Sequence, residues 1–235
     1  TDIYTLSLHD ALPISTWQMS GRIPNNQGTH SKNLSFTLIS DLRGLNINLP
    51  APMEKTAESS VPLNISMSVT PDQGILVQAR YGENLNSLSL FNDERGNWRF
   101  DRGEVKFGTG VPTLPESSGL VVSGSLVDFS VDAWKAYSIQ SAAPSGQLLP
   151  AFLSSVDLEF NQFSGFGQTI DNLHVQLDRD ISAWKLGLTS AAISGQVNLP
   201  FVADNAHPLS ADMQRVTWIS KSDKADTVTT PSTLK

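Results

Sequence analysis

The chain has 235 residues, no cysteine and a formal net charge of −7 at pH 7. That length is enough for one large all-β domain or two small ones, and the lack of cysteine excludes disulfides, thiolate catalysis and cysteine-based zinc sites. A mildly acidic chain with scattered charges is also a poor nucleic-acid binder, because phosphate contacts need clustered Lys and Arg. The longest uncharged stretch, residues 136–156, is too polar to cross a bilayer as a helix.

The first residues resemble a translated sequencing adapter. Residues 3–14 read IYTLSLHDALPI, a string similar without gaps to the translation of a common short-read adapter. A signal peptide would need a basic start and a longer apolar core, which this segment lacks. We therefore interpret residues 1–15 as an adapter-derived artefact, leave them out of the fold prediction, and do not treat His9 and Asp10 as site candidates.

Alternation of apolar and polar residues with a period of two dominates the rest of the chain. Such alternation predicts strands with one apolar face and one face rich in Asn, Ser and Thr. The predicted strands are residues 33–38, 45–49, 63–70, 173–178 and 195–199. Turn-forming sequences lie at residues 71–74, 93–97, 144–146 and 203–205.

Helical periodicity is confined to one short segment. Residues 132–140 form the only predicted helix, with Asp128, Ser130 or Asp132 as its N-cap. The predicted fold is therefore all-β, antiparallel throughout. Repeated hairpins would stack or curl into a shared sheet, with at most one short helix.

The residues that usually carry chemistry form no recognisable constellation. His30, His174 and His207 lack metal-binding spacing, and His174 is predicted on the polar face of its strand. The carboxylate pairs Asp93/Glu94, Asp157/Glu159 and Asp178/Asp180 are expected to be solvated surface groups. No G-x-S-x-G motif activates a serine. The sequence predicts no enzyme, no metal and no cofactor.

Three long segments, in the same order, resemble the YhdP family, large AsmA-like envelope proteins of Gram-negative bacteria. The first is SDLRGLNINLPAPMEKTAESSVPLNI, residues 40–65, and the second runs from residue 97 to 134. The third, residues 156–200, begins VDLEFNQFSGFGQTIDNLHVQLDRD. On this resemblance, residues 16–221 would be a YhdP-like central β domain and residues 222–235 a polar linker or truncated end.

The resemblance implies phospholipid transport between the inner and outer membranes. The chain would then form a long curved sheet or open trough in the periplasm, with an apolar inner face. The full-length protein would be anchored to the inner membrane by an N-terminal part not represented here. The partners would be phospholipid acyl chains, with no nucleic acid and no cofactor. Together with the alternating faces, the resemblance assigns the groove lining to Leu34, Phe36, Leu38, Leu45, Ile47, Leu49, Leu63, Ile65, Met67, Val69, Val105, Phe107, Leu173, Val175, Leu177, Val197 and Leu199.

Alternation alone leaves other architectures open. A structural or adhesive β-sandwich would give the same pattern, because its two inner faces pack together. A carbohydrate-active enzyme would need a carboxylate pair converging in a cleft. A transmembrane barrel ranks last, since its strands need aromatic girdles and longer regular runs.

Overall fold

The computed structural model describes residues 3–7, 15–23, 34–70, 74–141, 150–201 and 208–217. The described residues form thirteen strands and one helix. Their bounds are β1 (Ile3–Ser7), β2 (Trp17–Arg22), β3 (Leu34–Ser40), β4 (Leu63–Thr70), β5 (Gly74–Tyr81), β6 (Leu85–Glu94), β7 (Asn97–Phe107), β8 (Gly119–Ser130), α1 (Val131–Ser141), β9 (Leu153–Gly165), β10 (Gln168–Arg179), β11 (Ala183–Thr189), β12 (Ile193–Pro200) and β13 (Ser210–Val216).

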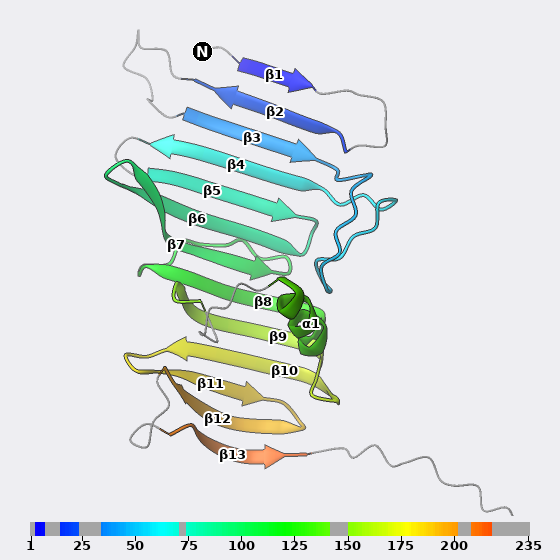
Figure 1. The fold of residues 1–235 in the computed structure, drawn as a ribbon, viewed down its shortest axis with the longest axis vertical. Helices are drawn as coiled ribbons and strands as arrows, with labels where there is room; N and C mark the ends of the chain where they lie inside the picture. Colours follow the sequence, from blue (N-terminus) through cyan, green and yellow to red (C-terminus); the bar gives the residue numbers. More distant parts are fainter. Residues whose placement is uncertain are drawn as a thin grey trace, which may run out of the picture.

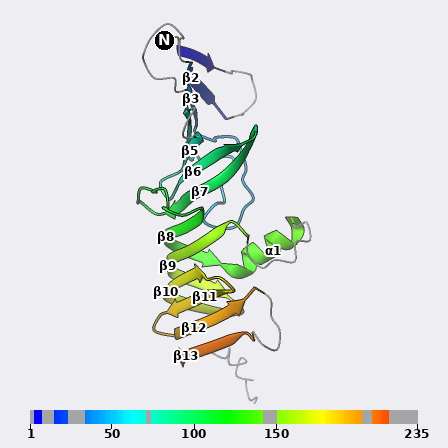
Figure 2. The ribbon, with the colours of Figure 1, turned by 90° about the vertical axis from the view of Figure 1, so that its left-hand side faces the viewer.

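All thirteen strands belong to one sheet, in which each strand is hydrogen-bonded to the next one along the chain. Figure 1 shows the strands side by side in chain order, with β1 at one end of the sheet and β13 at the other. Figure 2, turned by 90°, shows a single twisted layer from which α1 projects to one side. The prediction of a mostly β fold built as a long sheet with one short helix is confirmed.

The sheet is not antiparallel throughout, and on this point the prediction is wrong. β8 runs parallel to both of its neighbours, β7 and β9. Parallel neighbours need a connection that crosses the sheet, whereas a tight turn joins antiparallel ones. Here residues 108–118 join β7 to β8, and the connection from β8 to β9 contains α1.

The short helix is confirmed, and one of the three predicted caps is used. The Ser130 hydroxyl accepts a hydrogen bond from the backbone N–H of Ala133 at 3.2 Å, as an N-cap residue does. The turn predicted at residues 93–97 is also present, with Arg95 and Gly96 at positive φ between β6 and β7. The turns predicted at 144–146 and 203–205 lie outside the described residues.

The strand predicted at residues 45–49 is wrong. Residues 41–62 form a long loop between β3 and β4. The β-type pairing in this loop is limited to an isolated antiparallel bridge between Ile47 and Lys55. Lys55 is buried, and its ammonium group donates to the carbonyl oxygens of Leu45 (2.9 Å) and Thr56 (2.8 Å). Proline at positions 50 and 52 has no N–H for a ladder, which disfavours a regular strand here.

The connection from β7 to β8 is held to the polar face by Glu104, which is buried at 6% exposure. Its carboxylate accepts hydrogen bonds from the Thr113 backbone N–H (2.6 Å), the Ser123 hydroxyl (2.6 Å) and the Lys106 ammonium group (3.2 Å). Burial acts to raise the pKa of Glu104, but these hydrogen bonds outweigh it and hold the pKa below its ordinary value. The ionised carboxylate therefore stabilises this connection.

β1 lies within the segment that we interpret as adapter-derived. It pairs antiparallel with β2, Leu6 opposite Met19. Pairing of this kind does not depend on the origin of the residues, so the adapter interpretation stays a prediction.

Candidate functional site

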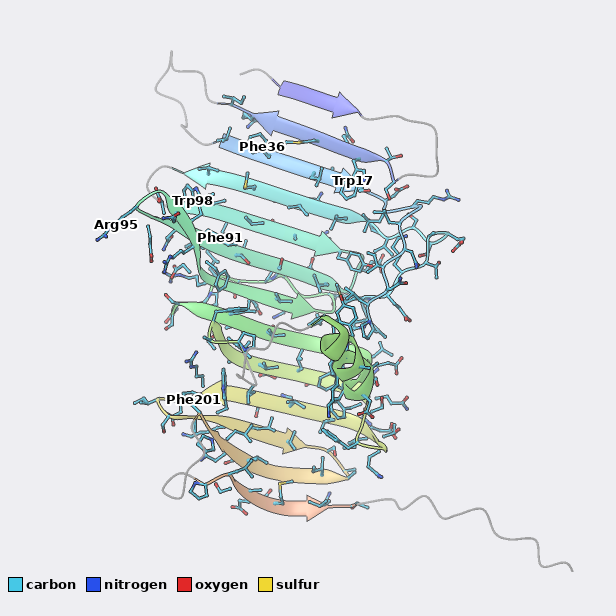
Figure 3. The ribbon with its side chains drawn as sticks, in the orientation of Figure 1. Trp17, Phe36, Phe91, Arg95, Trp98 and Phe201 are labelled. Atoms are coloured by element: carbon cyan, nitrogen blue, oxygen red, sulfur yellow. The ribbon has the colours of Figure 1, made fainter. Side chains whose placement is uncertain are left out.

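One face of the sheet is apolar from strand to strand. Residues that are paired across neighbouring strands point to the same side, so the register traces this face through the molecule. Phe36 of β3 is paired with Met67 of β4, and Met67 with Val77 of β5. Val77 is in turn paired with Ser89 of β6. Figure 3 labels Phe36 on β3.

The same face continues into the second half of the sheet. Ser87 of β6 is paired with Val105 of β7, and Val105 with Val122 of β8. Val122 is paired with Val156 of β9, and Val156 with Leu177 of β10. We call the side of the sheet that carries these residues the apolar face, and the other side the polar face.

The strand residues predicted to line a groove all lie on the apolar face. They are Leu34, Phe36, Leu38, Leu63, Ile65, Met67, Val69, Val105, Phe107, Leu173, Val175, Leu177, Val197 and Leu199. The remaining three, Leu45, Ile47 and Leu49, lie in the 41–62 loop and belong to no strand. Their assignment to the same surface depended on the strand that the structure does not contain.

No second sheet packs on the apolar face among the described residues, since every strand belongs to the one sheet. As a consequence, few side chains are enclosed: Leu173, at 2% exposure, is among the most buried. Most of the predicted lining residues are only half-buried. An apolar face of this extent without a covering layer is typical of a binding surface.

The apolar face is hollowed into a groove in its second half. The groove has a volume of about 470 Å³. Its walls come from β8 to β13 and are almost entirely apolar; they include Leu158, Phe160, Leu173, Val175 and Leu188. Apolar pockets of several hundred Å³ are the usual sites for apolar ligands.

Several groove residues were missed from the sequence. Phe129 contacts both Phe160 and Phe163, with ring centroids 5.3 and 6.1 Å apart. Phe160 and Phe163 are both on the apolar face although three positions apart, because the regular alternation is interrupted between them. Leu158 and Phe160 could have been found, since they alternate with Asp157 and Glu159, which were predicted to face outward.

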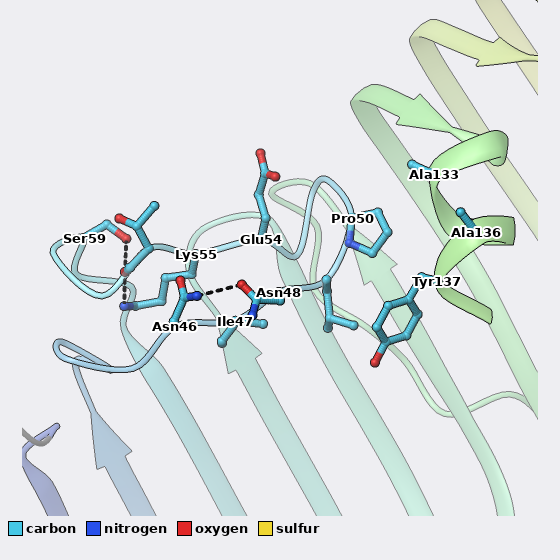
Figure 4. Close-up of a pocket in the computed structure, with 12 residues that line it drawn as sticks. Asn46, Ile47, Asn48, Pro50, Glu54, Lys55, Ser59, Ala133, Ala136 and Tyr137 are labelled. Atoms are coloured by element: carbon cyan, nitrogen blue, oxygen red, sulfur yellow. Dashed lines mark hydrogen bonds between the residues drawn. The ribbon is translucent and has the colours of Figure 1, made fainter. Parts of the chain in front are cut away.

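At one end of the strands the apolar face is bordered by the 41–62 loop and α1. The indole N–H of Trp134 in α1 donates to the carbonyl oxygen of Ala51 at 2.9 Å, and the Tyr81 hydroxyl donates to Met53 at 3.2 Å. A cavity of about 670 Å³ lies between the loop and the helix, lined by Ile47, Leu49, Ala136 and other residues. Figure 4 shows it with the loop on one side and α1 on the other.

Among the described residues, the titratable side chains do not converge on one site. His174 lies on the polar face, as predicted, 2.7 Å from the Asp157 carboxylate. Asp180 forms an ion pair with Lys185 at 2.6 Å. Among the residues that the structure describes, no three His, Asp or Glu side chains gather closely enough to hold a metal ion. His30 and His207 lie outside the described residues.

Within the described part of the chain, no helix is long and apolar enough to cross a membrane.

Comparison with known proteins gives one match. The family model described as "YhdP protein" matches residues 11–235. No curated protein and no solved structure matches the chain.

Proposed function

The chain belongs to the YhdP family, and on that premise we propose that it is a segment of a phospholipid-conducting trough between the inner and outer membranes of a Gram-negative envelope. In this proposal it lies in the periplasm and binds acyl chains along the apolar face. Movement of lipid along the apolar face is passive in this proposal. Acyl chains exchange water for apolar contact, worth about 25 cal/mol per Å² of buried apolar surface.

The observation that carries the proposal is the combination of an open sheet and a continuous apolar face. In a closed sandwich a second sheet would cover that face about 10 Å away, and the described residues form a single sheet. The groove of about 470 Å³ in the second half supports it further, because its walls carry apolar side chains suited to hydrocarbon. A structural or adhesive module would have no need of such an uncovered face.

The test is native mass spectrometry of the gently purified 235-residue chain, followed by extraction and identification of bound lipid. Wild type is expected to carry phospholipid. Val175→Glu places a carboxylate in the groove wall, and because an unpaired charge among acyl chains is strongly unfavourable, lipid occupancy should fall at least tenfold (about 1.4 kcal/mol or more).

Gln176→Glu is the matched control. Gln176 is the next residue, exposed on the polar face, so the same charge there should leave bound lipid unchanged. Circular dichroism checks that both variants are folded. A wild-type chain that stays lipid-free after incubation with phospholipid vesicles, or equal occupancy in both variants, would overturn the proposal.

A further inference from the structure

Arg179 is a charged residue on the apolar face. It is the last residue of β10 and is paired with Trp184 of β11, two positions beyond Leu177, so its side chain lies on the apolar side. By the same register, the other Lys and Arg side chains on the described strands lie on the polar face. A cation at this position needs a reason, because apolar surroundings do not stabilise it.

Two aromatic rings hold the guanidinium group. Its central carbon lies 5.6 Å from the ring centroid of Trp184 and 5.2 Å from that of Phe201. The two rings pack edge to face, with centroids 6.0 Å apart, and the guanidinium also donates a hydrogen bond to the carbonyl oxygen of Ala151. Figure 3 labels Phe201 on the left-hand side of the sheet. Cation–π contacts orient a guanidinium without neutralising its charge.

The two acidic residues that flank Arg179 in the sequence interact with Lys185. Asp180 forms its ion pair with Lys185. Asp178 is paired with Lys185 across β10 and β11, on the polar face, and its charge adds to the effect of Asp180 in raising the pKa of Lys185. Among the described residues, no carboxylate lies within ion-pair distance of Arg179. Its charge and most of its five N–H donors are therefore available to a ligand.

An apolar strip leads away from this cation. Leu177 is next on the same face of β10 and is buried in a cluster with Trp184 and Leu153. Val175 and Leu173 follow along the strand and line the groove. From Arg179 to Leu173 the strand covers about 20 Å at its usual rise per residue. One leaflet of a bilayer contributes about half of a 30 Å hydrocarbon core. The strip is therefore long enough for an acyl chain that starts at Arg179.

We propose that Arg179, held by Trp184 and Phe201, binds the phosphate group of a phospholipid whose acyl chains lie along the β10 strip into the groove. This inference rests on the function proposed above and adds headgroup recognition to it. A planar guanidinium with paired N–H donors is the side chain best suited to a phosphate. The site would distinguish phospholipids from uncharged lipids with the same acyl chains.

The experiment uses two water-soluble probes, dihexanoyl phosphatidylglycerol and dihexanoylglycerol, which share acyl chains and differ in the phosphate headgroup. Dissociation constants are measured by isothermal titration calorimetry for the 235-residue chain. Arg179→Gln should weaken binding of the phospholipid about tenfold, as expected for loss of a hydrogen-bonded charge pair, and leave dihexanoylglycerol binding unchanged.

Arg215→Gln is the matched control. Arg215 is also exposed and also donates to a backbone carbonyl, that of Ala191 at 3.2 Å, but it lies on the polar face. Its replacement should change neither dissociation constant. A third titration with inorganic phosphate separates a lipid headgroup from a free anion.

The outcomes separate the two proposals. If wild type binds neither lipid, the proposed function fails and this inference with it. If wild type binds both lipids and Arg179→Gln binds phosphatidylglycerol as tightly as wild type, only the inference is overturned. It is also overturned if Arg179→Gln loses binding of inorganic phosphate but keeps that of phosphatidylglycerol, because the site would then serve free anions.

Discussion

Two leucine-to-alanine substitutions distinguish an open groove from a closed core. Leu173 and Leu126 belong to the same buried cluster and are 2% and 4% exposed. They differ in one respect: Leu173 lines the groove of about 470 Å³ and Leu126 does not. We expect Leu173→Ala to destabilise the protein less than Leu126→Ala, although both changes remove the same atoms.

The loss of unfolding free energy in a Leu→Ala substitution has two parts, the lost burial of the removed carbons and the cavity that they leave. Loss of three buried carbons costs about 2.4 kcal/mol at roughly 0.8 kcal/mol per methylene. A closed cavity adds up to about 2 kcal/mol more, which accounts for the spread between known Leu→Ala substitutions. At Leu173 the space left by the side chain merges with a groove that is already open, so we expect about 2–3 kcal/mol. At Leu126 the cavity is enclosed, so we expect about 4 kcal/mol.

The assay is equilibrium unfolding in urea, monitored by tryptophan fluorescence on delipidated protein. Equal slopes of free energy against urea are required, so that midpoints can be compared as stabilities. If Leu173→Ala costs as much as Leu126→Ala or more, the groove is not an open space and the reasoning is refuted. That result would favour a covered apolar face.

Two further predictions concern the parts that border the sheet. Because the folded-state pKa of Glu104 lies below its ordinary value of 4.5, its carboxylate contributes stability above that pH and loses it as the pH falls through the folded-state pKa. The difference in unfolding free energy between wild type and Glu104→Gln should therefore shrink on acidification from about pH 7 to about pH 3, and a constant difference would count against the hydrogen-bonded carboxylate. Trp134→Phe keeps an aromatic ring beside Phe129 but removes the donor to Ala51. It should cost about 1 kcal/mol and speed protease cleavage within the 41–62 loop, whereas unchanged cleavage would mean that α1 does not hold the loop.

The sequence predicted the apolar face because side chains on a strand alternate strictly between its two sides. Leu63, Ile65, Met67 and Val69 could therefore be assigned to one face before any partner strand was known, and the register places the predicted strand residues on a common side. The same alternation wrongly predicted a strand at residues 45–49. Alternation there occurs in a loop, where no neighbouring strand provides a ladder.

Local pattern determined β3, β4, β10 and β12, the presence of α1 and the apolar side of these strands, since these depend on neighbours in the chain. Three other features depend on contacts between distant residues, and only the tertiary structure decided them. They are the single layer that the described strands form in place of a sandwich, the parallel placement of β8, and the position of Arg179 beside Trp184 and Phe201. The physical reason is that period-two alternation specifies that a face is apolar but not what covers it, because a second sheet and a lipid chain impose the same pattern on a strand.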